Sequence, residues 1–222
     1  MNDDTHFNTY ILSSKKRLMN RIIIADDHPI FIEGLKETIS SWDDYQLVAC
    51  ASNGYELIQL CSENKADIIV LDYKMPNLNG IDAIIHIKKI SNAKLVVMSF
   101  SLDECVINQA KDNGAHGFIN KSVDMKTLYR KLNEILEGKI IFPTEEDIFN
   151  IYYAPLKTKF GLSRQETYLI KDINEGLSIE EISNKRFISI ETVKSHKKRI
   201  FYKLDIKKIS ELLFFLKKNI IS

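Results

Sequence analysis

The chain of 222 residues contains few cysteines, prolines and tryptophans: three, four and one. Cys50, Cys61 and Cys105 are an odd number without a CxxC pair, which excludes a disulfide framework and a cysteine zinc site. No apolar stretch reaches membrane-spanning length, and residues 1–20 lack the apolar centre of a signal peptide. We therefore expect a reduced, cytoplasmic protein without membrane contact, whose residues 1–20 are a disordered extension.

Two further absences concern glycine motifs and net charge. The chain has neither GxxxxGK[ST] nor GxGxxG, which argues against the usual nucleotide-binding loops. The net charge is only +1, but it is unevenly distributed. Residues 157–222 hold 15 Lys and Arg against 8 Asp and Glu, a charge of +7, whereas the remainder holds 16 against 22, a charge of −6. The C-terminal part is therefore the one expected to meet a polyanion.

What the chain does contain is a regular alternation of patterns between residues 21 and 138. Short apolar runs predict strands at 21–25, 46–50, 67–71, 94–98 and 116–119. Helical periodicity predicts helices near 29–41, 54–63, 80–91, 103–113 and 124–137. Strict alternation is typical of an α/β fold, here a doubly wound, five-stranded parallel sheet with helices on both faces.

Polar residues follow three of these strands. Asp26 and Asp27 come after the first, Asp72 after the third and Ser99 after the fourth. The carboxyl ends of parallel strands meet at one edge of the sheet, so we expect these residues to lie together. Three aspartates can bind one divalent cation and offer a carboxylate nucleophile, as phosphoryl transfer onto an aspartate requires. The histidines at 28, 86 and 116 share no metal-site spacing, and we expect surface or helix-end roles for them.

Beyond a linker predicted at 139–157, with room for one short helical turn, the chain is helical. Ser163 with Glu166 and Ser178 with Glu181 are capping boxes that predict two helix starts. Ser189 is expected to cap a third helix, and a fourth apolar helix is expected at about 207–218. The pattern predicts an all-α domain of four helices at 158–222.

The third of these helices has two distinct faces. Ile190, Val193, Ile200, Phe201 and Leu204 share an apolar arc, and Lys194, Ser195, Lys198 and Tyr202 lie opposite. His196 lies between Ser195 and Lys197 in the sequence, and we weigh helix packing and a DNA-phosphate contact about equally for it. Two capped helices and a short turn before such a helix have the proportions of a DNA-binding helix-turn-helix.

In combination these motifs resemble the two-domain response regulators of the NarL/FixJ family, with a CheY-like receiver and a LuxR-type helix-turn-helix. The receiver resemblance rests on Asp26-Asp27-His28-Pro29, the stretch from Leu71-Asp72 to Asn79-Gly80, Met98-Ser99 and Gly117-Phe118-Ile119-Asn120-Lys121. The C-terminal resemblance rests on Leu162 to Glu166, Glu175 to Ser178, Glu181-Ile182, Ile188-Ser189, Thr192 to His196 and Lys203-Leu204. It covers about 200 residues, and it places a receiver at 21–138.

The resemblance implies specific roles at the sheet edge. Asp72 would be the phosphoacceptor, and Asp26, Asp27, Asp72 and the backbone carbonyl of Lys74 would bind Mg²⁺. Lys121 would pair with the carboxylate and then with the phosphoryl group. Ser99 and Phe118 would report phosphorylation, although Phe118 lacks the hydroxyl of the tyrosine often found there.

The resemblance also implies the output surfaces. The residues expected at DNA are Thr192, Lys194, Ser195, His196, Lys198 and Arg199. The excess apolar surface of the last helix fits a homodimer contact, with Ile209, Leu212, Leu213 and Leu216 as its residues. Burial of this surface against the receiver would explain it equally well.

We predict a transcription regulator that binds double-stranded DNA as a dimer and is controlled by phosphorylation from a histidine kinase or a small phosphodonor. One alternative is an orphan regulator whose receiver is never phosphorylated, against which the intact acidic set argues. Another is an aspartyl-phosphate phosphatase. Those enzymes place a second acid two residues after the nucleophile, where this chain has Lys74, so we expect no enzyme.

Overall fold

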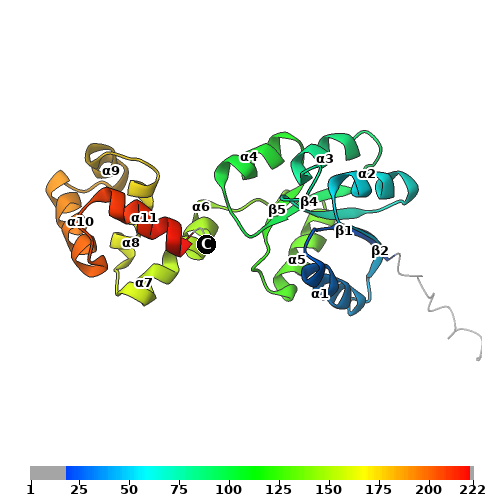
Figure 1. Cartoon of the computed structure of the whole chain (residues 1–222), viewed down its shortest axis with the longest axis horizontal. Helices are drawn as coiled ribbons and strands as arrows, with labels where there is room; N and C mark the ends of the chain where they lie inside the picture. Colours follow the sequence, from blue (N-terminus) through cyan, green and yellow to red (C-terminus); the bar gives the residue numbers. More distant parts are fainter. Residues whose placement is uncertain (1–18, 221–222) are drawn as a thin grey trace, which may run out of the picture. The chain divides into compact units, whose positions relative to one another are not determined.

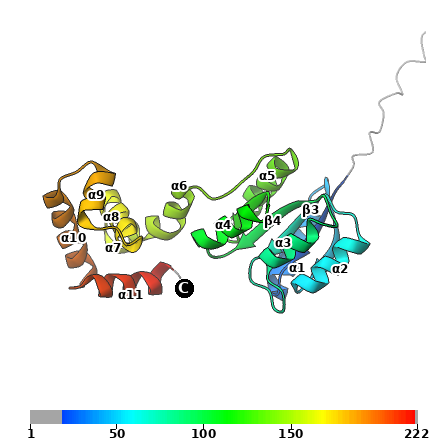
Figure 2. The same ribbon diagram turned by 90° about the horizontal axis from the view of Figure 1, so that it is seen from above.

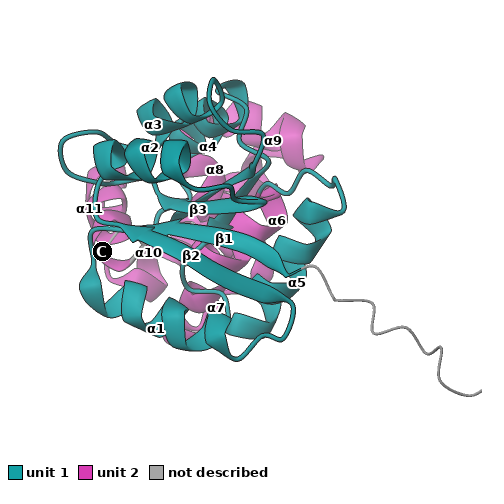
Figure 3. Cartoon of the chain, turned by 90° about the vertical axis from the view of Figure 1, so that its right-hand side faces the viewer, with its two compact units in different colours: residues 1–142 teal, residues 143–222 magenta. Residues whose placement is uncertain are grey.

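The computed structural model describes residues 19–220, which divide between Phe142 and Pro143 into two compact units (Figure 3). Residues 1–18 of the predicted disordered extension lie outside the described residues. Asn20, its last residue, begins the first strand. The second unit begins 15 residues before the predicted domain start at 158.

The first unit is built on a parallel sheet of five strands. They are β1 (Asn20–Ala25), β2 (Tyr45–Ala51), β3 (Ile68–Asp72), β4 (Lys94–Ser99) and β5 (Gly117–Asn120), in the order β2-β1-β3-β4-β5. All four neighbouring pairs are parallel, which confirms the predicted doubly wound sheet. The strand order reverses between β1 and β3, the position at which such sheets bind ligands.

Five helices cover the two faces of this sheet (Figures 1 and 3). They are α1 (Pro29–Ser40), α2 (Gly54–Glu63), α3 (Gly80–Ile87), α4 (Glu104–Asp112) and α5 (Met125–Leu136). Alternate strand residues such as Ile22 and Ile24 pack in one core with Leu35 of α1 and Leu132 of α5. The helices α2, α3 and α4 lie on the other face. The helices expected from sequence are thus confirmed, with ends that differ by up to four residues.

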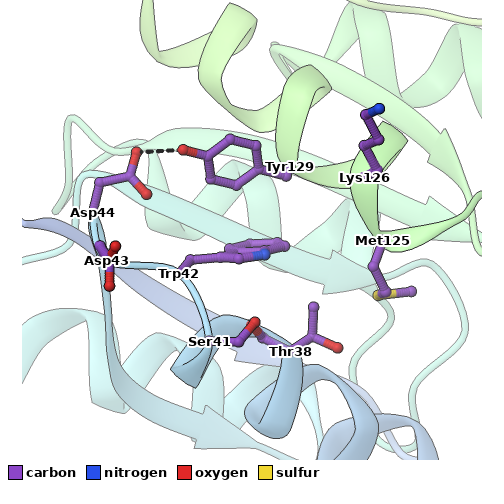
Figure 4. A pocket seen from close by; sticks show the side chains of 8 residues that line it. All are labelled: Thr38, Ser41, Trp42, Asp43, Asp44, Met125, Lys126 and Tyr129. Carbon is purple, nitrogen blue, oxygen red and sulfur yellow. Dashed lines mark hydrogen bonds between the residues drawn. The ribbon is translucent and has the colours of Figure 1, made fainter.

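Three aromatic residues pack together on the side of the sheet that α1 and α5 cover. Trp42, Tyr45 and Tyr129 pack edge to face with ring centroids 5.0–5.9 Å apart. The hydroxyl of Tyr129 donates to Asp44 at 2.8 Å, and the hydroxyl of Tyr45 donates to Asn133 at 3.0 Å. An open hollow of about 590 Å³ lies beside this cluster, and Figure 4 shows the side chains that line it. These contacts tie the start of β2 to α5.

The second unit is entirely helical (Figure 2). It comprises α6 (Glu145–Ile148), the π-helix η1 (Phe149–Tyr153), α7 (Ala154–Phe160), α8 (Arg164–Asn174), α9 (Ile179–Arg186), α10 (Ile190–Leu204) and α11 (Ile209–Ile220). Both predicted capping boxes are present, at Ser163 and Ser178, and the hydroxyl of Ser189 accepts from the backbone N–H of Thr192.

The linker predicted at 139–157 is wrong from Pro143 onward. Residues 145–160 are helical, and Phe149, Tyr153 and Leu156 are buried in the core of the second unit. The ring of Phe149 stacks on Tyr168 with centroids 3.9 Å apart. A π-helix has a wider turn than an α-helix, so it shifts the apolar spacing in the middle of the segment and hides the amphipathic pattern.

Candidate functional site

The ends of β1 and β3 bring together an acidic cluster made of Asp26, Asp27, His28 and Asp72. One ligand atom from each of these four side chains lies within 4.8 Å of the others. Asp26 and Asp72 are nearly fully buried, whereas Asp27 is partly exposed. The three carboxylates predicted from strand ends therefore do meet at one place, and they can offer oxygen ligands to a divalent cation.

Lys121, which directly follows β5, neutralises the buried part of this cluster. Its Nζ lies 2.6 Å from Asp26 and 2.9 Å from Asp72. The same ammonium group lies 4.7 Å from the ring centroid of Phe31 and 5.4 Å from that of Phe100. A buried charge is tolerated only when it is paired in this way, so the lysine and the two carboxylates form one electrostatic unit.

The pKa of Asp72 reflects this environment. Burial raises the pKa of its carboxyl above the ordinary value, and the hydrogen bond and charge of Lys121 oppose that rise. The nearby Asp26 adds to the rise by like-charge repulsion. Lys121 thus helps to keep the buried Asp72 ionised, as a carboxylate nucleophile requires.

The loop after Asp72 is shaped by Gly80. A Cβ built on Gly80 would lie 2.2 Å from the carbonyl oxygen of Asp72. The Gly80 N–H also donates to the carbonyl of Tyr73 at 3.0 Å. Lys74 is exposed in this loop, and the metal-binding role of its carbonyl stays a prediction. Only glycine lets the start of α3 approach the end of β3 so closely.

This contact leads to a testable difference between two glycines. Gly80→Ala is expected to lower the free energy of unfolding by about 1–3 kcal/mol because its methyl group must displace the Asp72 backbone. Gly34→Ala is the matched control, since no atom lies within 4 Å of the added Cβ in helix α1. It should be neutral or stabilise by about 0.5–1 kcal/mol. Urea unfolding of both variants measures the difference, and equal stabilities would contradict the close approach.

Ser99 ends β4, and Phe118 lies within β5, which pairs with β4. The Ser99 hydroxyl is nearly buried and accepts from the backbone N–H of Ser101 at 3.1 Å. The backbone N–H of Lys121 donates to the carbonyl of Ser99 at 2.9 Å. The ring of Phe118 is fully buried. The switch roles of both residues stay predictions.

In the second unit α10 presents a polar, basic face. Lys194, Ser195, Lys198 and Arg199 are exposed, whereas Val193 and Ile200 are buried in the core. The Thr192 hydroxyl lies 2.8 Å from that of the capping Ser189, which occupies part of its hydrogen-bonding capacity. The burial of Val193 and Ile200 agrees with the helical-wheel prediction, but Ile190, which was predicted in the same apolar arc, is exposed at the start of α10.

His196 lies on a different side of α10 from the exposed lysines. It lines a pocket of about 260 Å³ together with residues of α8 and Arg186 of α9. Its Nδ1 atom is buried and has no hydrogen-bond partner among the described residues. His196 therefore faces α8 rather than the open basic face, and its predicted contact with DNA stays a prediction.

Two buried carboxylates position α10 and the turn before it, and the sequence pattern revealed neither role. Glu166, recognised only as a capping residue, also accepts from Lys203 of α10 at 2.8 Å. Asp172 is fully buried and accepts from Arg186 at 2.6 and 2.7 Å. Burial raises the pKa of Asp172, but hydrogen bonds from Arg186 and Lys185 outweigh it, so the pKa lies below the ordinary value.

The dimer residues predicted on α11 divide into two groups. Leu212 and Leu216 are buried in the core of their own unit, so the prediction of a dimer contact is wrong for these two. Ile209 and Leu213 are exposed, as is Phe214, which is 71% exposed. Apolar residues on nearly all sides of α11 had made its inner and outer faces indistinguishable by sequence.

Comparison with known families adds independent evidence. Residues 22–133 match the response regulator receiver domain, and residues 161–216 match the luxR family of bacterial regulatory proteins. The chain belongs to the response regulators. Its fold, a receiver followed by a LuxR-type helix-turn-helix domain, confirms the resemblance drawn from the motifs.

Similar response regulators align over most of the chain. The transcriptional regulatory protein YdfI of Bacillus subtilis is 28% identical over 191 residues, which cover 84% of this chain and 90% of YdfI. The DNA-binding transcriptional activator EvgA of Escherichia coli K12 is 29% identical over 203 residues, which cover 90% of this chain and 98% of EvgA. The structure of the RcsB response regulator of Salmonella typhimurium is 26% identical in sequence, with a TM-score of 0.54. The match covers 89% of this chain and 99% of the RcsB chain. The RcsB chain in an RcsB–DNA complex is 25% identical, with a TM-score of 0.52. The match covers 90% of this chain and 98% of that RcsB chain.

This response regulator belongs to a family of two-component transcription regulators rather than of enzymes. The helices of residues 19–220 are too short or too polar for any of them to cross a membrane.

Proposed function

We propose that this response regulator accepts a phosphoryl group on Asp72 and answers by binding a specific DNA sequence as a dimer. The observation that carries the proposal is the buried unit of Asp72, Asp26 and Lys121, with Lys121 within 2.9 Å of both carboxylates. A surface ion pair would need no such burial.

Asp26, Asp27, Asp72 and the carbonyl of Lys74 are the groups proposed to hold Mg²⁺. The carboxylates are hard oxygen donors, which Mg²⁺ prefers, and partly exposed Asp27 leaves room for its remaining water ligands. When bound, the ion neutralises charge between the attacking carboxylate and the phosphoryl group.

In the proposed reaction a carboxylate oxygen of Asp72 attacks the phosphorus of the donor. The new O–P bond forms as the bond from phosphorus to the donor's leaving group breaks, so Asp72 becomes an acyl phosphate and the donor departs. The donor is a phosphohistidine of a sensor kinase or a small acyl phosphate. Lys121, already 2.9 Å from Asp72, is placed to pair with a phosphoryl oxygen afterwards.

Ser99 and Phe118 are proposed to convert the added charge into a change of the receiver surface. A phosphoryl group adds nearly two negative charges and three acceptor oxygens, and it would draw the Ser99 hydroxyl away from Ser101. The ring of Phe118 is proposed to fill the space that the Ser99 hydroxyl leaves. A group at Asp72 can influence DNA only by shifting such a two-state surface.

Ser99→Ala tests this coupling. The variant is expected to accept phosphate on Asp72 but to lose most of the gain in dimerisation or DNA affinity, because it lacks the hydroxyl that reports the charge. Affinity is measured with and without acetyl phosphate, and the exposed Ser62→Ala of α2 is the control. An undiminished gain in Ser99→Ala would mean that the signal leaves by another route. Equal affinities of phosphorylated and unmodified wild type would favour the orphan alternative.

The output is proposed to be major-groove recognition by α10, with Thr192, Lys194, Ser195, His196, Lys198 and Arg199 as the contacting residues. Two such domains would read two half-sites of matching symmetry. The proposed dimer surface is reduced to the exposed residues of α11, Ile209 and Leu213, together with Phe214. Their exposed apolar surface is the kind that homodimer interfaces bury.

A further inference from the structure

The turn between α9 and α10 contains one residue in an unfavourable backbone conformation. Phe187 follows α9 as its C-cap residue with φ 54° and ψ 42°, in the left-handed region. A bulky aromatic residue is poorly suited to this region, whereas glycine and asparagine adopt it readily. Of the other described residues that are not glycine, only Asn77 and Asp205 have a positive φ, and both are types that tolerate it. Phe187 is thus the least suited of the three to its conformation.

The fold holds this turn in place from both sides. The backbone N–H of Phe187 donates to the carbonyl of Asn184 at 3.4 Å, and that of Ile188 donates to the carbonyl of Ser183 at 3.2 Å. The hydroxyl of Ser183 donates to the carbonyl of Ile188 at 2.6 Å. The side chain of Ile188 packs against the core of the unit. The surrounding contacts therefore impose the strained conformation on Phe187 and fix the place from which its ring projects.

The ring of Phe187 is open to solvent. It is 95% exposed, more than any other large apolar residue in the described part of the chain. A ring that is so exposed buries little apolar surface, so it adds little to the stability of the unit. Asparagine or glycine would suit the turn better. Strained residues that packing does not explain are found preferentially at functional sites.

The two cationic residues before Phe187 are already paired with carboxylates of the same unit. Arg186 donates to both carboxylate oxygens of Asp172, at 2.6 and 2.7 Å. Lys185 lies 3.0 Å from Asp172 and 3.0 Å from Glu175. Contacts with DNA phosphates are made chiefly by lysine and arginine. The turn therefore presents apolar surface, and the charges beside that surface are neutralised.

This apolar surface lies beside the start of the recognition helix. Phe187 stands two residues before Ser189, the N-cap residue of α10. Two residues of chain span at most about 7 Å, so the turn reaches the same place as the first residues of α10. In a helix-turn-helix these first residues contact base edges in the major groove. The apolar group that the major groove offers is the methyl group of thymine, which a phenyl ring can contact.

We infer that Phe187 is an apolar contact to DNA that selects thymine at one position of each half-site. The inference rests on the proposed function, because it requires α10 to lie in the major groove. The ring covers the thymine methyl group and removes it from water. Cytosine offers no methyl group at that position, so a site with cytosine there binds more weakly. Phe187 thereby adds sequence preference to binding without adding charge.

The test compares wild type with Phe187→Asn in the full-length protein. Asparagine tolerates the left-handed conformation, so the melting temperature should not fall. The probe is the duplex that wild type selects from random sequences, in which each thymine is replaced in turn by deoxyuridine, which lacks only the methyl group. At one thymine of each half-site, wild type should bind the deoxyuridine duplex about fourfold more weakly, the effect of burying one methyl group. Phe187→Asn should bind the two duplexes alike.

Tyr55→Ala is the matched control for the loss of an exposed ring. Tyr55 is 62% exposed on α2, in the other unit. The variant should bind the selected duplex like wild type and should respond to deoxyuridine at the same position.

Two outcomes would overturn the inference and leave the proposed function standing. One is a wild type whose affinity responds to deoxyuridine at no position, which needs no variant to establish. The other is an operator affinity that Lys194→Ala lowers but Phe187→Asn does not, which would place the ring away from DNA. A wild type that selects no sequence at all would sink the proposed function and the inference with it.

Discussion

Asp72→Asn is expected to take up no phosphoryl group from acetyl phosphate and Mg²⁺, whereas wild type gains the mass of one. The amide is a far poorer nucleophile than the carboxylate. It also cannot pair ionically with Lys121, which lies 2.9 Å from Asp72. Intact mass spectrometry measures the adduct. Asp112→Asn, at the exposed end of α4, is the control and should be labelled like wild type.

The same measurement has two supporting arms. Asp27→Ala and chelation of the metal should each reduce labelling strongly, because both remove the cation that neutralises charge during transfer. An adduct that persists in Asp72→Asn would place the phosphoryl group on another residue and refute the assignment. Labelling that survives chelation would refute the proposed role of Mg²⁺ but not the assignment of Asp72.

Lys194→Ala and Lys198→Ala are each expected to weaken binding to the operator by about 1–3 kcal/mol if the lysine reads a base. Both side chains are exposed on α10, while the core of the unit holds the helix through Val193 and Ile200, so the thermal melt should hardly change. The operator is first selected from random duplexes, and affinity is then measured by fluorescence anisotropy at several salt concentrations.

The salt dependence distinguishes base contacts from phosphate contacts. A lysine that contacts only phosphate should weaken binding to all sequences alike and lower the salt slope by about one. Lys217→Ala, at the exposed end of α11, is the control and should have little effect on affinity. Unchanged operator affinity in both α10 variants would show that another face of the unit meets DNA.

The sequence by itself determined the parallel sheet and the edge at which its polar residues collect. Runs such as 68–71 are uniformly apolar because parallel strands are buried on both faces, and a polar residue directly after such a run can only lie at the strand end. Asp26, Asp72 and Ser99 were therefore placed correctly without coordinates. Capping boxes at Ser163 and Ser178 likewise marked helix starts, since they depend on contacts only three residues apart.

Features that depend on longer contacts needed the tertiary structure. The segment 145–160 contains a π-helix whose wide turn breaks the regular apolar spacing, so only its packing against Tyr168 reveals it as part of the second core. On α11 nearly every side is apolar, and only the neighbouring helices decide that Leu212 is inside and Phe214 outside.

His28 shows the same limit at the site itself. Its neighbours in sequence, Asp26 and Asp27, gave it no metal-site spacing, and Asp72 stands 44 residues away. Local patterns determine strands, helix starts and the edge at which polar groups collect, because these depend on neighbouring residues. Which side chains finally share one cation, one core or one exposed face is decided by packing between distant segments, since only the folded chain brings their atoms within bonding distance.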